Sequence, residues 1–148
     1  MARVFPEIVA YGSAFRFAIE AEAACADLAT AAAQEAPDDA WRAKLAEVAS
    51  SHRERVQKLT VIRQEVNEMI LEPIHSLKGG DYLGAVDKDP AKGWPGVVLQ
   101  LISAERGCAR YHEDFVTKCG DVLAASARAF DKAARQDRTT ANELSELL

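Results

Sequence analysis

Two glutamates interrupt apolar helical patterns in this chain. Glu22 lies among Ile19, Cys25 and Ala26, and Glu105 lies among Leu101, Ile102, Cys108 and Ala109. A carboxylate within an apolar stripe is costly to bury unless it is paired with a cation, protonated or bound to a metal. Both glutamates are therefore candidates for metal or proton chemistry, although protonated or water-linked core carboxylates are the alternative interpretation.

A histidine and an aspartate occupy comparable positions on two other stretches. His52 follows Val48 and Ala49 on an inward face, and Asp137 follows Ala133 and Ala134. Carboxylate and imidazole donors suit iron, manganese or zinc. We therefore predict a metal site formed by Glu22, His52, Glu105 and Asp137, with a divalent iron, manganese or zinc ion as the cofactor, or none.

Other interpretations of these side chains stay open. His52 could be a hydrogen-bonded core histidine, and Asp137 could be a surface or interhelix ion-pair partner. Cys25 and Cys108 are expected to be small core residues, with a soft-metal or redox role as the alternative. His112 follows Glu105 by two turns, and packing is expected of it rather than ligation.

Four alanine-rich stretches must position these side chains, and alanine is the best helix former. Apolar residues recur at helical spacing from about Pro6 to Gln34, Ala40 to Leu71, Trp94 to Lys118, and Val122 to the C-terminus. Either aspartate of Asp38-Asp39 could cap the second helix. Sustained alternation is absent, so we expect no strands.

The segment from Glu72 to Gly93 contains Pro73, Gly79-Gly80, Gly84 and Pro90 and cannot hold a long helix. The order is therefore helix, short turn, helix, long connection, helix, short turn, helix. Short turns give antiparallel neighbours, and one long connection permits a crossover between the second and third helices. We predict an all-α antiparallel four-helix bundle with that crossover, as one domain over residues 1–148; an up-down-up-down bundle would also tolerate the long connection.

The first and third stretches share the pattern A-E-x-x-C-A, at residues 21–26 and 104–109. Each copy places Cys three residues after Glu. A doubled helical hairpin would explain the repetition, and chance similarity between alanine-rich helices is the alternative.

Composition excludes several classes. The net charge of −5 and the scattered basic residues argue against nucleic acid as a partner. Three cysteines without a CxxC pair argue against a disulfide framework and against a four-cysteine zinc or iron site. We see no signal peptide and no membrane-spanning run. We expect a cytoplasmic protein that forms a homodimer and binds neither membrane nor nucleic acid.

Three segments resemble the rubrerythrin-like branch of the ferritin-like superfamily: residues 17–22 (FAIEAE), 51–59 (SHRERVQKL), and 101–105 (LISAE) continuing into 111–113 (YHE). The resemblance implies a ferritin-like bundle in which Glu22 and Glu105 match lone glutamate ligands, and His52 matches the histidine of a Glu-x-x-His pair. Ala49, Ala134 and Asp137 stand where the family has Glu, Glu and His. The resemblance thus implies a degenerate di-iron site, and we expect no rubredoxin domain.

Two functions follow as hypotheses. The first is a ferritin-like metal-binding protein that handles iron, peroxide or oxygen. Its site would retain only some of the family's carboxylate and histidine ligands. The second is a non-catalytic bundle that has lost its metal site and serves as a dimerising or interaction module. Whether the protein is an enzyme stays open.

Overall fold

The computed structural model describes residues 7–66, 73–83, 86, 89–119 and 124–148. Along the chain these residues form the following elements: β1 (Glu7–Ala10), α1 (Tyr11–Glu35), α2 (Asp39–Glu65), β2 (Pro73–Lys78), the 3₁₀ turn η2 (Gly79–Asp81), α3 (Gly96–Cys119) and α4 (Ala124–Leu147). Among the described residues, no helix combines the length and the apolar character needed to cross a membrane.

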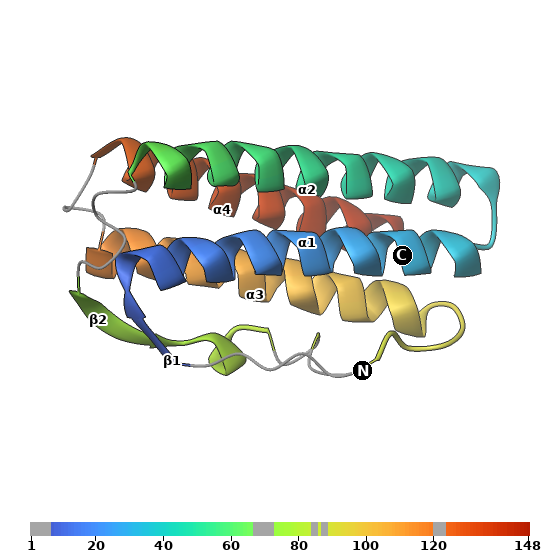
Figure 1. Ribbon diagram of the computed structural model, residues 1–148. Coiled ribbons are helices and arrows are strands. Elements are labelled where there is room, and N and C mark those ends of the chain that lie inside the picture. Colours follow the sequence, from blue (N-terminus) through green and yellow to red (C-terminus); the bar gives the residue numbers. More distant parts are fainter. Residues whose placement is uncertain (1–6, 67–72, 84–85, 87–88, 120–123) are drawn as a thin grey trace.

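The four long helices form a bundle of two hairpins. Helix α1 packs along α2, α3 packs along α4, and α1 also packs along α3. Helices α2 and α3 run in the same direction, so the chain between them crosses from one end of the bundle to the other (Figure 1). The predicted all-α four-helix bundle, with its long crossover between the second and third helices, is confirmed.

The expectation that the chain has no strands is wrong. Strands β1 and β2 pair antiparallel in a two-stranded sheet, with Glu7 opposite Lys78 and Ile8 opposite Leu77. Ile8 and Leu77 are buried against the bundle. Burial of these apolar side chains and the shared backbone hydrogen bonds compensate for the shortness of the strands.

Helix boundaries differ from the sequence prediction at two places. The first helix begins at Tyr11, because residues 7–10 belong to β1. The described part of the second helix ends at Glu65, and the rest of its predicted range, 67–71, lies outside the described residues. Its N-terminus is capped as expected, since the Asp38 side chain accepts a hydrogen bond of 2.9 Å from the backbone N–H of Trp41.

Aromatic side chains fill one part of the core. Phe115 of α3 stacks on Phe130 of α4 with ring centroids 3.9 Å apart, and Phe15 of α1 meets the Phe130 ring edge-on at 5.1 Å. The Tyr111 hydroxyl donates a 3.0 Å hydrogen bond to the carbonyl oxygen of Ala14. These contacts fix α1, α3 and α4 in register with one another.

The crossing connection lies directly on α3. A Cβ atom built at Gly107 would lie 1.8 Å from the carbonyl oxygen of Tyr82. The Tyr82 hydroxyl also donates a 2.8 Å hydrogen bond to Asp114, about two turns after Gly107 in α3. Glycine at position 107 thus allows the two backbones to approach, and the tyrosine holds the connection in place.

Candidate metal centre

The structure brings the four predicted site residues to the middle of the bundle. Glu22 comes from α1, His52 from α2, Glu105 from α3 and Asp137 from α4, and each side chain is fully buried. Asp137 therefore does not lie on the surface, although it does take part in interhelix ion pairs. Whether the four bind a metal stays a prediction.

The His52 ring lies between two carboxylates. Its Nδ1 atom is hydrogen-bonded to Glu22 and its Nε2 atom to Glu105. A neutral imidazole can donate from only one nitrogen, so both contacts as donors require the imidazolium. Burial alone would lower the pKa of His52, but the charges of Glu105 and Glu22 raise it well above its ordinary value. The two glutamates therefore favour the imidazolium form of His52 in the metal-free protein.

Arg55 is a member of this cluster that the sequence analysis missed. Its Nε donates a 3.2 Å hydrogen bond to Glu22 Oε2, and its Nη2 lies 3.2 Å from Asp137 Oδ1. The side chain is only 7% exposed. The available signal was its position three residues after His52, which places both on one face of α2.

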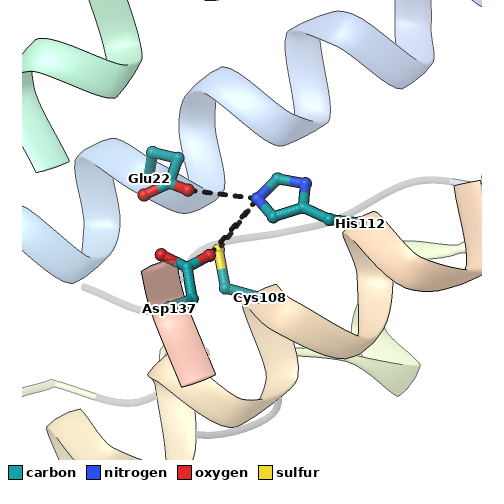
Figure 2. Close-up of side chains that lie close together, drawn as sticks. All are labelled: Glu22, Cys108, His112 and Asp137. Carbon is teal, nitrogen blue, oxygen red and sulfur yellow. Dashed lines mark hydrogen bonds and ion pairs between the residues drawn. The ribbon is translucent and has the colours of Figure 1, made fainter. Parts of the chain in front are cut away.

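His112 also belongs to the site, where only packing was expected of it. Its Nε2 atom lies 3.1 Å from Glu22 Oε1, 3.4 Å from Asp137 Oδ2 and 3.9 Å from Cys108 Sγ. Figure 2 shows Glu22, His112, Cys108 and Asp137 directed toward a common point from α1, α3 and α4. The missed signal was the spacing of four between Cys108 and His112, which stacks them on one helical face.

The pKa values of the three carboxyl groups are shifted in different directions. Burial favours the neutral form of Glu22, but His52 and His112 outweigh burial and hold its pKa well below the ordinary value. Burial raises the pKa of Glu105 despite the opposing charge of His52. Burial and the charge of Glu22 raise the pKa of Asp137 to about 7. Glu22 is thus the carboxyl group of the cluster that most favours the ionised form.

The histidine on α3 is basic for a related reason. Burial lowers the pKa of His112, whereas its contacts with the Asp137 and Glu22 carboxylates raise it more strongly, to about 9. Two imidazolium groups and the Arg55 guanidinium can therefore balance the three carboxylates without a metal ion.

The donor atoms fall into two groups, each of which could hold one ion. One contains Glu22, Cys108, His112 and Asp137, and the other contains Cys25, His52 and Glu105, with donor atoms within 4.8 Å of one another in each. In both groups the glutamate comes from one hairpin and the thiol from the other. The repeated A-E-x-x-C-A pattern thus corresponds to a repeated arrangement in space.

Several buried polar atoms of the cluster have no hydrogen bond among the described residues: Glu105 Oε2, His112 Nδ1 and both carboxylate oxygens of Asp137. Such atoms are expensive to bury unless an ion or water satisfies them. Ala49 and Ala134 are buried and supply no donor. The cluster therefore offers carboxylate and imidazole donors to an ion, but it lacks the further carboxylates that would bridge two ions in a dinuclear site.

Comparison of the chain with protein-family models, with curated proteins and with solved structures finds no match. The functional assignment therefore depends on the site itself.

Proposed function

We propose that this protein binds one divalent transition-metal ion at the centre of its bundle. It would be a ferritin-like protein whose metal site has fewer ligands than a di-iron site. The main support is the convergence of buried carboxylates and two imidazoles, in which Glu105 Oε2 has no hydrogen bond among the described residues and the Asp137 oxygens have only their ion pairs with Arg55 and His112. An unsatisfied oxygen in a dry core gains most from a cation. Iron(II), manganese(II) and zinc(II) all accept such donors.

The proposed stoichiometry is one ion per chain. A dinuclear iron site needs carboxylates that bridge two metals, and alanine occupies both positions at which the related family would supply them, 49 and 134. We therefore expect fast oxidation of iron(II) by oxygen to be weak or absent.

A second function is favoured by Arg55. A guanidinium cannot ligate a metal, and it already pairs with Glu22 and Asp137. A cluster that balances its own charge could be the core of a non-catalytic interaction module. This alternative predicts that the protein does not bind divalent ions.

Metal analysis of protein purified without chelator, combined with thermal unfolding, separates the two functions. Metal binding predicts one ion per chain and a rise in melting temperature on addition of zinc(II) or iron(II). An ion at one hundred times its dissociation constant should stabilise the fold by about 2.7 kcal/mol. Protein that contains no metal and shows no thermal shift would support the interaction module instead.

A matched pair of variants ties the metal to the cluster. Glu22→Gln should reduce metal content, whereas Glu20→Gln should not, because Glu20 lies two residues away on the exposed face of α1. Equal metal loss in both variants would mean that the ion binds elsewhere.

A further inference from the structure

We infer that the ion is zinc(II), held in a four-coordinate site by Glu22, Cys108, His112 and Asp137, with Cys108 as a thiolate ligand. This inference rests on the proposed metal binding and specifies its ligands and its metal. It differs from the site predicted from sequence, which had carboxylate and imidazole donors only.

The spacing of the donors fits a tetrahedron. Bonds of about 2.0–2.3 Å to a tetrahedral zinc ion place neighbouring ligand atoms about 3.3–3.8 Å apart. His112 Nε2 lies 3.1, 3.4 and 3.9 Å from the nearest donor atoms of Glu22, Asp137 and Cys108. All four donor atoms lie within 4.8 Å of one another and face one point (Figure 2). Small side-chain movements would therefore complete the site.

In the metal-free protein, the polar side chains around His112 Nε2 are not all hydrogen-bonded. His112 Nε2 can carry one proton, yet it faces two carboxylates and a sulfur atom. Asp137 is fully buried, and its oxygens make no hydrogen bond among the described residues, only ion pairs of 3.2 Å with Arg55 and 3.4 Å with His112. A cation at the common point would satisfy all of these donors together.

The remaining cations orient the ligands. His52 and Arg55 contact Oε2 of Glu22, which leaves Oε1 to face His112. Arg55 also lies beside Oδ1 of Asp137, which leaves Oδ2 on the His112 side. Outer contacts of this kind fix the direction of metal-ligating carboxylates. Arg55 is thus a positioning residue that turns two carboxylates toward the ion.

The donor set favours zinc over manganese or iron. Thiolate is a soft ligand that suits zinc, whereas manganese prefers oxygen donors in octahedral geometry. On binding, the Cys108 S–H proton and the proton on His112 Nε2 pass to solvent, and the freed lone pairs bind the ion. Four protein ligands leave no open position, which is typical of a structural zinc site.

Cobalt(II) provides a direct spectroscopic test, because it substitutes for zinc and absorbs visible light. Wild-type protein should bind one cobalt per chain, with the intense visible bands of four-coordinate cobalt and near-ultraviolet thiolate-to-cobalt charge transfer. Cys108→Ser should abolish the charge-transfer band. Cys119→Ser, at the C-terminal end of α3, and Cys25→Ser, in the other donor group, should retain it.

Each other outcome has one meaning. Cobalt bound without thiolate charge transfer would overturn the inference and leave the proposed metal binding intact. Loss of the band in Cys25→Ser but not in Cys108→Ser would place the ion in the other donor group and also overturn it. Protein that binds neither cobalt nor zinc would refute both proposals.

X-ray absorption of the zinc-loaded wild-type protein tests the same ligand without any variant that must fold. We expect one sulfur at about 2.3 Å and the remaining ligands at about 2.0–2.2 Å. A ligand shell of oxygen and nitrogen alone would contradict the inference.

Discussion

Glu22 is the residue on which the cluster depends most, because it contacts His52, Arg55 and His112 at once. An isolated glutamate in an apolar core would be a burden whose removal stabilises the protein. Here removal of its charge leaves buried cations uncompensated. We predict that Glu22→Gln lowers the unfolding free energy of the metal-free protein by about 3–5 kcal/mol.

Urea unfolding with a chelator present measures this effect. The exposed control Glu20→Gln should change stability by no more than about 0.5 kcal/mol. A Glu22→Gln variant as stable as the wild-type protein would show that the ion pairs contribute nothing net.

His112 gives the metal-free protein a pH-dependent stability. Its pKa is about 9 in the folded state against an ordinary 6.5, so its contribution is complete below pH 6.5 and is lost as the pH rises to about 9. That shift corresponds to roughly 3 kcal/mol. Asp137, whose pKa is raised to about 7, also holds its proton more tightly when folded and acts in the same direction at lower pH.

We therefore predict that the unfolding free energy of the metal-free protein falls as the pH rises from 6.5 to 9. Denaturant unfolding at several pH values measures it, and His112→Gln should make the fall shallower over that range, leaving the part that comes from His52. A stability that increases with pH there would contradict the assigned protonation of His112.

Sequence reasoning found the four central site residues because each interrupts an apolar stripe with a polar group. It missed Arg55 because a long side chain can either extend into solvent or turn inward, and the sequence does not distinguish these. It undervalued His112 because the partners of that residue, Glu22 and Asp137, come from other helices. Contacts between distant segments decided both cases.

Among the elements, α3 and the crossing connection offer a test based on one glycine. Alanine in place of an interior helical glycine normally stabilises a helix by about 1 kcal/mol. At Gly107 the new Cβ would collide with the Tyr82 carbonyl. We predict that Gly107→Ala instead destabilises the protein by about 1–3 kcal/mol.

Thermal unfolding compares this variant with Gly80→Ala, where an added Cβ meets nothing within 4 Å. The control should unfold close to the wild-type temperature. A stabilised Gly107→Ala protein would mean that the connection does not lie against α3 in solution.

The elements themselves were predictable to different degrees. Long amphipathic helices repeat their signal over many turns, so α1 to α4 were recognisable from sequence. Strands β1 and β2 have four and six residues, and they pair across more than sixty positions of sequence. Their stability comes from that distant pairing and from burial of Ile8 and Leu77, and neither is visible in a local pattern.

At the scale of the whole molecule, charge balance within the cluster predicts the consequence of metal removal. Small zinc domains unfold without their ion because the ion supplies most of their folding free energy. This bundle has an extensive apolar core and internal cations opposite its carboxylates. We predict that a chelator lowers the melting temperature but leaves the helical circular dichroism spectrum unchanged at 25 °C. Loss of helical signal on chelation would make the ion a requirement for folding.

Each donor group draws its ligands from both hairpins, and this bears on how such a chain could evolve. Each donor group takes its glutamate from one hairpin and its thiol from the other, so a lone hairpin of this type would need a second copy of itself to complete either group. A chain that joins two copies resembles a symmetric pair of subunits fused end to end. After such a fusion, each half can change without altering the other. In a chain of that origin, His52 of α2 and Asp137 of α4 would be differences of the kind that this freedom allows.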